Sequence, residues 1–238
     1  MLSVKNKTQV SANMLRIAFE VDVPIDWLPG CYIKLRIPNA LPGGISPVRT
    51  YTVRSYDAAN QVLAVDFAIH QPAGPATAWA LNAQPGDQIE YRGPGKLRVD
   101  PTNGDWHLFA ADMSALPAAI SIMESLSLDA KGYAFLEVTE EQDRQALHIP
   151  EGIQVQWLVH PNPKVKSNQQ LEAIRNIKPL AGKPSVFVAG ELSTTREIKQ
   201  FLLQAPTYQS GSHYISSYWK IGLTEEEHKM AKRSAPAG

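Results

Sequence analysis

A change of pattern near residue 103 is the feature that most constrains the fold of this chain. Short apolar runs and amphipathic helical runs alternate after that point. Strands that alternate with helices form a parallel sheet with the helices packed on it. We therefore expect an α/β domain over residues 103–238. Its expected strands are 107–112, 132–140, 155–160 and 185–191, and its expected helices are 114–126, 169–177 and 194–205.

The first part of the chain is rich in short β-type runs that turn residues separate. Such spacing is typical of an antiparallel barrel or sandwich. We expect a β-barrel domain over residues 1–102, with the boundary in the segment 99–106, and a frayed tail at 228–238. Its expected strands are 15–21, 31–38, 49–56, 62–70 and 88–94, with one helix at 74–83.

Composition narrows the classes of function. Lysine plus arginine and aspartate plus glutamate both number 23, so the chain is neutral and neither nucleic acid nor a membrane surface is an expected partner. The single cysteine, Cys31, excludes an internal disulfide and an all-cysteine iron–sulfur cluster, and no metal-ligand spacing occurs. The N-terminus has no signal-like apolar core and no run is long enough to span a bilayer. We expect a cytoplasmic protein.

The stretch RTYTVR, residues 49–54, has the residue types that a flat, phosphorylated cofactor needs. Tyr51 offers an aromatic face, Thr52 can reach a ring nitrogen, and the planar fork of Arg49 matches a phosphate. The alternative is an edge strand with solvated arginines and a tyrosine packed into the barrel. Spacing alone leaves both interpretations open.

A second candidate site begins the expected helix at Gly74, Pro75, Ala76 and Thr77. The free N–H groups of a helix N-terminus bind phosphate, and small residues permit its close approach. The alternative is an ordinary helix start with proline in its first turn.

Seven short motifs occur in the same order as in a known family, over roughly residues 15–222. They are RTYTVR, DFAIH, AGPATAWA, GPGK, AADMSALPAAI, VAGE and YWKIG. Together they resemble the siderophore-interacting protein family, which consists of FAD-dependent ferric-siderophore reductases of the ferredoxin–NADP reductase superfamily. The resemblance implies an FAD-binding barrel followed by a parallel-sheet, nucleotide-binding domain.

The resemblance also implies roles for residues. Arg49 contacts the FAD phosphates, Tyr51 stacks on the isoalloxazine ring and Thr52 lies near flavin N5. The segment 66–70 lines the flavin edge and 74–77 cradles the pyrophosphate. Trp79 either packs its helix or forms a wall near the cofactor, and packing is the favoured role. The implied cofactor-binding residues are Arg49, Tyr51, Thr52, Val53, Asp66, Phe67, Ala68, Ile69, His70, Gly74, Pro75, Ala76 and Thr77.

For the nucleotide half, the chain has no G-x-G-x-x-G fingerprint. The family pattern Asp-Glu-Thr-Ala-Leu-Pro becomes Asp-Met-Ser-Ala-Leu-Pro here, which places the affinity for NAD(P)H in question. For Asp112 and the residues that follow it, the alternative is a structural strand–helix turn. For Glu191, the alternative is a carboxylate that caps the next helix. The implied nucleotide-binding residues are Asp112, Ala115, Leu116, Pro117 and Glu191.

A ferric siderophore often carries negative charge, so its binding surface should be basic. The family resemblance points to Lys34 and Lys220, although a single lysine is more often a solvated surface charge. Paired Tyr218 and Trp219 cover the flavin or anchor the C-terminal segment, and anchoring is the commoner role.

We expect a monomeric FAD-dependent ferric-siderophore reductase with NAD(P)H or a ferredoxin as electron donor. Reduction weakens iron binding, since Fe(II) is held less tightly than Fe(III) by hard oxygen ligands. No catalytic acid–base residue is required. The alternatives are a flavoprotein that passes electrons to a protein or quinone, and a non-catalytic iron-chelate carrier.

Overall fold

The computed structural model describes residues 1–38, 40–209, 211–225, 227–228 and 230, which form two compact units. Most of the tail that was expected to fray, 229 and 231–238, lies outside the described residues. Unit 1 comprises Met1–Arg98, Pro117–Ser125 and Glu141–His148, and unit 2 comprises Val99–Leu116, Leu126–Glu140 and Ile149–Gly238.

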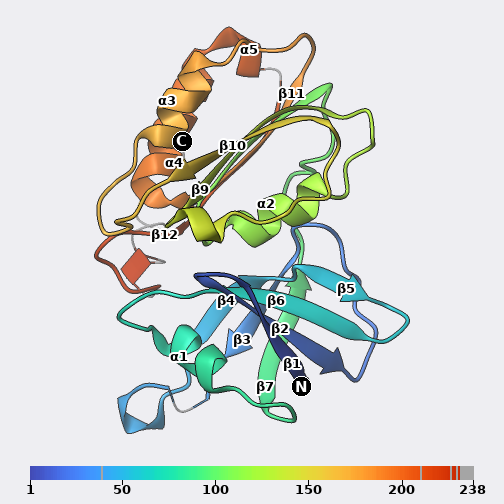
Figure 1. Ribbon diagram of the computed structural model, residues 1–238, viewed down its shortest axis with the longest axis vertical. Coiled ribbons are helices and arrows are strands. Elements are labelled where there is room, and N and C mark those ends of the chain that lie inside the picture. Colours follow the sequence, from blue (N-terminus) through green and yellow to red (C-terminus); the bar gives the residue numbers. More distant parts are fainter. Residues whose placement is uncertain (39, 210, 226, 229, 231–238) are drawn as a thin grey trace. The chain divides into compact units, whose positions relative to one another are not determined.

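Unit 1 is built on an antiparallel sheet of seven strands in the order β4-β3-β7-β1-β2-β6-β5 (Figure 1). The outermost strands of this order, β4 and β5, are joined by only Val53 and Arg54, so the sheet curls back on itself as a barrel does. This confirms the predicted antiparallel barrel, although the expected strand 49–56 is interrupted and the first strand was not predicted. The strands are β1 (Leu2–Ser11), β2 (Met14–Val21), β3 (Tyr32–Arg36), β4 (Val48–Thr52), β5 (Ser55–Asp57), β6 (Val62–Ala68) and β7 (Gln88–Gly95).

Alternating burial along these strands forms the core of unit 1. In β3, for example, Ile33 and Leu35 are fully buried while Lys34 between them is exposed. Helix α1 (Pro75–Asn82) packs on β6 and β2, and its Trp79 stacks on Phe19 with ring centroids 6.2 Å apart and planes 9° apart. The predicted packing role of Trp79 is therefore confirmed.

Two segments from the second half of the sequence complete unit 1. Helix α2 (Leu116–Met123) contributes Ser121, whose Oγ accepts a hydrogen bond from the Gly30 N–H at 3.4 Å. A short 3₁₀ turn, η2 (Glu141–Asp143), contributes Asp143, which is fully buried and accepts hydrogen bonds from Ser11 Oγ (2.9 Å), Asn13 N (2.6 Å) and Asn13 Nδ2 (2.9 Å).

Unit 2 is a parallel sheet of five strands in the order β10-β9-β8-β11-β12, which confirms the predicted α/β architecture. The order reverses between β8 and β11, which makes the carboxyl ends of these strands a topological switch point. The last strand, β12, was not predicted. The strands are β8 (Trp106–Ala111), β9 (Lys131–Val138), β10 (Gly152–Val159), β11 (Pro184–Glu191) and β12 (Ser212–Trp219).

Two helices cover one face of this sheet (Figure 1). Helix α3 (Gln169–Asn176) contacts β9, and α4 (Leu192–Gln204) contacts β11, β12 and α3. Every residue of β8 and β11 is buried, as expected for strands inside a parallel sheet. The remaining regular elements are the 3₁₀ turn η1 (Pro42–Gly44) in unit 1 and α5 (Pro206–Gln209) in unit 2. Among the described residues, none of the helices combines the length and apolar character that crossing a membrane requires.

Candidate functional site

Strand β4 places Arg49 and Tyr51 of the RTYTVR motif on the same face of the sheet. Arg49 pairs with Leu35 and Tyr51 pairs with Ile33 across the antiparallel ladder, so these side chains share the core side of the sheet. The Tyr51 ring is half-buried and packs on Phe67, with ring centroids 4.4 Å apart and planes 42° apart. This contact fixes the orientation of the Tyr51 ring.

The second arginine of the motif has a structural partner. Arg54 Nη1 and Nη2 each lie 2.7 Å from a carboxylate oxygen of Glu124, the residue directly after α2, and Arg54 Nε lies 4.0 Å from Asp66 Oδ2. The Arg54 side chain is only 12% exposed. Arg54 therefore joins the end of α2 to the barrel within unit 1.

Several predicted cofactor-binding residues have side chains buried within unit 1. Asp66 is 5% exposed, and its carboxylate oxygens accept hydrogen bonds from Arg16 Nε at 2.6 Å and Nη2 at 2.8 Å. At such positions only the backbone could contact a ligand. The buried positions are Val53, Asp66, Phe67, Ala76 and Thr77, whereas Ala68 and Ile69 are half-buried and His70 is exposed.

The start of α1 is suited to a phosphate. Gly74 is the N-cap and Pro75 opens the helix, and no side chain caps this end. The His70 ring lies beside it, with His70 Nδ1 2.9 Å from the Pro72 carbonyl oxygen. Backbone N–H groups at such an end attract anions. An oriented tyrosine, Arg49 half-exposed on the same strand and a helix start without a side-chain cap are the groups that FAD requires, so the residues of unit 1 fit this cofactor.

In unit 2, Asp112 ties together the ends of three strands. Its carboxylate accepts hydrogen bonds from Ser114 N (2.9 Å), Ser114 Oγ (2.5 Å), Glu191 N (2.9 Å) and Trp219 Nε1 (2.7 Å). Burial raises the pKa of Asp112, and the hydrogen bonds from Ser114 and Trp219 oppose that rise. The bond to Trp219 confirms the predicted anchoring role of this residue.

The adjacent glycine explains why this arrangement tolerates no side chain. Gly190 has φ +145°, and a Cβ atom there would lie 2.4 Å from Asp112 Oδ2. The Gly-Glu pair of the VAGE motif thus places a backbone N–H, and not a side chain, against the carboxylate of Asp112.

The other predicted nucleotide-binding side chains are also engaged in the fold. Glu191 Oε2 caps α4 by accepting from Ser193 N (2.5 Å) and Thr194 N (3.1 Å), as the helix-cap alternative predicted. The buried Ala115 and Leu116 donate their N–H groups to the Asp112 carbonyl at 2.9 and 2.8 Å. Pro117 is buried and belongs to unit 1. These contacts place Ala115 and Leu116 in a strand–helix turn and Glu191 at a helix cap.

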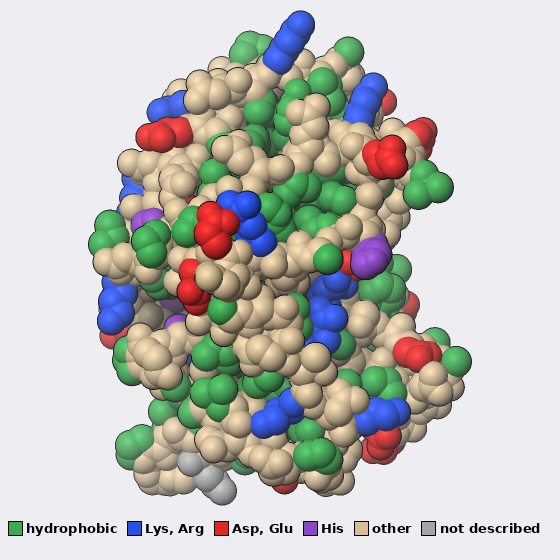
Figure 2. Space-filling view, viewed as in Figure 1, with side chains coloured by type: hydrophobic (Ala, Val, Ile, Leu, Met, Phe, Trp, Pro, Cys, Tyr) green, Lys and Arg blue, Asp and Glu red, His purple; other side chains and the backbone are tan. Residues whose placement is uncertain are grey.

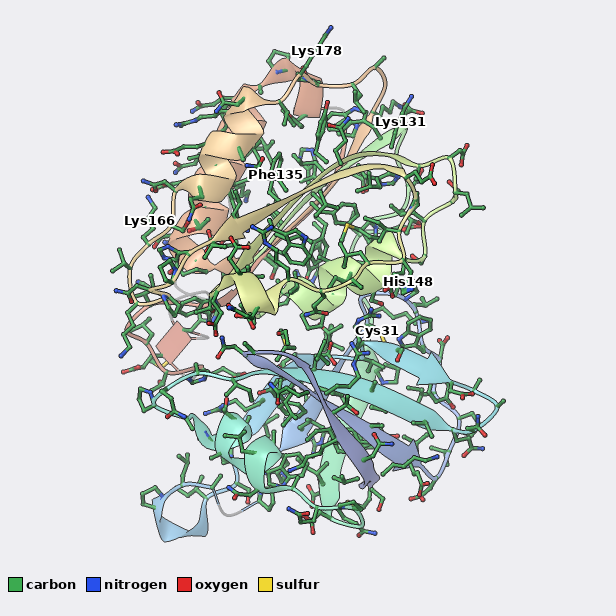
Figure 3. All side chains as sticks on the ribbon, viewed as in Figure 1. Cys31, Lys131, Phe135, His148, Lys166 and Lys178 are labelled. Atoms are coloured by element: carbon green, nitrogen blue, oxygen red, sulfur yellow. The ribbon has the colours of Figure 1, made fainter. Side chains whose placement is uncertain are left out.

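Glu137, near the end of β9, is a candidate that the motif analysis missed. The residue is half-buried, and its Oε2 atom is buried with no hydrogen-bond partner. Burial raises the pKa of Glu137, a hydrogen bond from Ser167 lowers it, and the charge of Asp112 raises it further. Figure 3 labels Phe135, two residues before Glu137 on this strand. The signal in the sequence was a carboxylate inside the apolar run FLEV, 135–138.

Lys34 lies on the outer face of the barrel, directly opposite Arg92 of β7. Like charges at directly opposed positions of a sheet are unfavourable. Among the residues described, neither cation forms an ion pair, whereas the neighbouring Arg36 pairs with Glu90 at 2.8 Å. A groove of about 320 Å³ runs over these side chains, lined by Met1, Lys34, Arg36, Val48, Glu90, Tyr91 and Arg92.

Arg36 and Arg92 were not predicted. The spacing of two residues between Lys34 and Arg36 was the available signal, since it places both on one face of a strand.

Lys220 is half-buried in unit 2, directly after Trp219, and its carbonyl accepts from Leu223 N at 3.1 Å. In Figure 2, basic and acidic side chains are interspersed on the face in view.

Comparisons with known proteins identify relatives of both parts of the chain. Residues 104–222 match the model of the siderophore-interacting protein family, and residues 40–97 match the model of the siderophore-interacting FAD-binding domain. Ferric vibriobactin reductase ViuB of Vibrio cholerae is 33% identical, over 96% of this chain and 92% of that protein. An NADPH-dependent ferric-chelate reductase of Escherichia coli is 27% identical, over 73% of this chain and 66% of that protein. The crystal structure of the siderophore-interacting protein SipS from Aeromonas hydrophila superimposes with a TM-score of 0.85 at 26% identity, over 98% of this chain and 95% of that one.

Proposed function

Because the chain belongs to the siderophore-interacting protein family, we propose that it is a flavin-dependent reductase of ferric siderophores. The observation that carries this proposal is the similarity to a ferric vibriobactin reductase along nearly the whole of both chains. The architecture agrees with it, because an antiparallel barrel followed by a five-stranded parallel sheet has the elements of a ferredoxin-reductase-like fold.

Unit 1 supplies the flavin-binding groups in this proposal. Tyr51, oriented by Phe67, stacks on the isoalloxazine ring, and Arg49 and the N-terminus of α1 bind the phosphates. The buried members of the predicted set, such as Asp66 and Thr77, support the site through packing and backbone groups. When bound, FAD supplies the redox chemistry, since a flavin accepts electrons in pairs and releases them singly.

The electron balance of the reaction is simple. One NAD(P)H gives up a hydride, which carries two electrons, and these reduce two Fe(III) ions to Fe(II) and leave one proton and NAD(P)⁺. A ferredoxin donor would deliver the same two electrons in two single steps. Fe(II) is then released because its siderophore ligands hold it less tightly than Fe(III).

The paired cations Lys34 and Arg92 bind the anionic chelate in this proposal. Two positive charges opposite each other in a ladder are unfavourable alone, and an anion between them removes that cost. Lys220, the other predicted siderophore-binding residue, lies in unit 2, where the Asp112–Trp219 hydrogen bond positions the chain that carries it.

The proposal extends to the setting of the protein. A single cysteine, Cys31, buried in unit 1 and labelled in Figure 3, suits a reducing compartment, so we propose a cytoplasmic location. We also propose a monomer in which residues 1–102 bind the flavin and residues 103–238 bind the nucleotide. Size-exclusion chromatography with light scattering tests the monomer.

The test is a visible spectrum of the purified protein, followed by anaerobic addition of NADH, NADPH and then a ferric catecholate. We expect a flavin spectrum that bleaches with a nicotinamide and returns with the chelate, while a ferrous chelator traps Fe(II). A flavin that ignores both nicotinamides, yet is reoxidised by the chelate after chemical reduction, indicates a ferredoxin-type donor.

Two other outcomes would replace the proposal with its alternatives. Reoxidation by a quinone or a redox protein, without reoxidation by any ferric chelate, indicates a flavoprotein with a different acceptor. A colourless protein that cannot be reconstituted with FAD, yet binds the chelate without a reductant, indicates a carrier. In that case Tyr51→Ala would leave chelate binding unchanged.

A further inference from the structure

The carboxyl end of β9 has a defined role in sheets of this topology. In doubly wound sheets a dinucleotide binds at the carboxyl ends of the strands, beside the point where the strand order reverses. The first strand and the turn after it approach the pyrophosphate, and an acidic residue roughly 20 positions further on binds the ribose hydroxyls of NAD. In unit 2 the first strand is β8, which ends beside Asp112, and Glu137 follows 25 residues later on β9.

Glu137 has an incomplete set of hydrogen bonds. The Oε2 atom of its carboxylate is buried and has no partner among the residues described. A buried acceptor without a donor is costly, and such an atom in a folded protein calls for an explanation. The 2′ and 3′ hydroxyls of a ribose are O–H donors, which is what this carboxylate lacks.

The charges around Glu137 disfavour the 2′-phosphate that NADPH carries and NADH lacks. The carboxylate of Asp112 lies close enough to raise the pKa of Glu137, and His160 is the neighbouring group that lowers it. His160 Nε2 lies 2.8 Å from the Val165 carbonyl oxygen, and Lys166, labelled in Figure 3, forms an ion pair with Glu197 at 2.6 Å. Both side chains therefore already have partners.

Arginine, the residue that accommodates a 2′-phosphate in NADP-binding sheets, is missing from the corresponding part of unit 2. The sequence from Leu126 to Glu140 and from Ile149 to Val165 contains none. The connection between β9 and β10 contains Arg144, which belongs to unit 1 and pairs with Glu141 at 2.7 Å.

We propose that this chain takes NADH in preference to NADPH as its hydride donor, and that Glu137 sets the preference. The inference rests on the proposed function, because it concerns the donor of the same reductase. The free ribose diol of NADH supplies donors to Glu137. The 2′-phosphate of NADPH would add a charge of about −1.5 to −2 beside two carboxylates.

The test is direct binding, measured by isothermal titration of the FAD-loaded protein with NAD⁺ and with NADP⁺, so that no turnover is involved. We expect the Kd for NAD⁺ to be lower by about tenfold or more, equivalent to about 1.4 kcal/mol. Glu137→Gln keeps the shape and removes the charge, so we expect it to reduce the ratio to within about threefold. Glu137→Arg should reverse the preference.

The matched control is Glu151→Gln, which makes the same chemical change just before β10, at the amino end of the parallel strands and away from their carboxyl end. It should leave the ratio of the two Kd values unchanged. Tighter or equal binding of NADP⁺ by the unmodified protein overturns the inference, and so does an unchanged ratio in Glu137→Gln.

Failure of this inference is distinguishable from failure of the proposed function. If neither nucleotide binds, yet the chemically reduced flavin still reduces a ferric catecholate, the NADH inference is wrong and the reductase stands. If NAD⁺ binds preferentially and the protein reduces no ferric chelate, the preference stands and the acceptor assignment is wrong.

Discussion

Arg54 and Glu124 form a bidentate ion pair, with both nitrogen–oxygen distances at 2.7 Å. The pair joins two segments that lie 70 residues apart in the sequence and belong to the same unit. Its geometry is that of the strongest class of ion pair, in which two parallel N–H groups meet one carboxylate. Arg54 also approaches Asp66, which itself holds Arg16, so four charges form one network inside unit 1.

Glu124→Gln is expected to destabilise the protein by about 2–3 kcal/mol, because Arg54 is largely buried and would lose its paired carboxylate. The free energy of unfolding in urea measures this. The control is Glu141→Gln, which breaks the exposed pair with Arg144 and should cost less than about 1 kcal/mol. Equal losses in both variants would contradict the buried role of the Arg54–Glu124 pair.

Arg49→Ala is expected to lower FAD affinity by about tenfold or more, because a charge-assisted contact with a phosphate is lost. The ratio of flavin absorbance to protein absorbance after dialysis measures it. Arg144→Ala, which removes an exposed arginine of unit 1, should retain FAD. Full FAD occupancy in Arg49→Ala would show that Arg49 does not bind the phosphates.

Lys34→Gln and Arg92→Gln should change stability and binding in opposite directions. Removal of one of two opposed like charges should stabilise the fold by about 0.2–1 kcal/mol. Each change should also weaken a ferric tris-catecholate several-fold without altering the flavin spectrum. Lys131→Gln, at an exposed position in unit 2, is the control for the chelate titration. Unchanged chelate affinity in both variants would exclude this surface as the substrate site.

Trp219→Phe is expected to cost about 1–2 kcal/mol, because Asp112 loses one of its hydrogen-bond donors and the C-terminal strand loses its anchor. Urea unfolding measures the loss. Trp157→Phe removes the same indole N–H at another half-buried position and should cost less. If Trp157→Phe proves the more costly change, the Asp112 contact does not anchor the strand.

The contribution of His107 and His213 to stability should fall as the pH is lowered from 7.5 to 5.5. Burial lowers the pKa of His107 below its ordinary value of 6.5, and it does the same for His213. The unfolded chain therefore binds protons first, and stability is lost as the pH falls through the unfolded pKa towards the folded one. Each unit by which the pKa is lowered corresponds to about 1.4 kcal/mol.

His107→Gln should reduce this pH-dependent loss of stability. It should not abolish the loss, because His213 still contributes to it. Urea unfolding at the two pH values measures the change. His148→Gln, at an exposed histidine labelled in Figure 3, should leave the loss unchanged. If His107→Gln loses as much stability between the two pH values as the unmodified protein does, His107 is not the group responsible.

The sequence pattern predicted both sheets because each strand type leaves its own signature. Buried parallel strands such as β8 and β11 are continuous apolar runs, and barrel strands such as β3 alternate. The pattern failed for β1, whose polar residues outnumber its apolar ones, and for β12, in which polar and apolar residues are equal in number. Pairing with neighbouring strands holds these two segments in place, and local sequence does not encode such pairing.

The candidate site was predictable to a different degree in each unit. The small residues before α1 and the tyrosine of β4 mark the flavin site by residue type alone. The roles of Glu191 and Asp112 could not be predicted in this way, because a carboxylate at a strand end can accept a hydrogen bond from a ligand or from a backbone N–H equally well. Only the hydrogen bonds in the structure show that both carboxylates accept from the protein itself.

Unit 1 is assembled from segments that are separate in the sequence, and this has a consequence for folding during synthesis. Chains emerge from the ribosome N-terminus first, and domains generally fold as units. The barrel strands are complete by residue 95, yet Glu124 and Asp143, which satisfy Arg54 and the Ser11–Asn13 turn, are translated later. We expect a nascent chain halted after residue 102 to be sensitive to protease, and protection to arise only once residue 148 has left the exit tunnel.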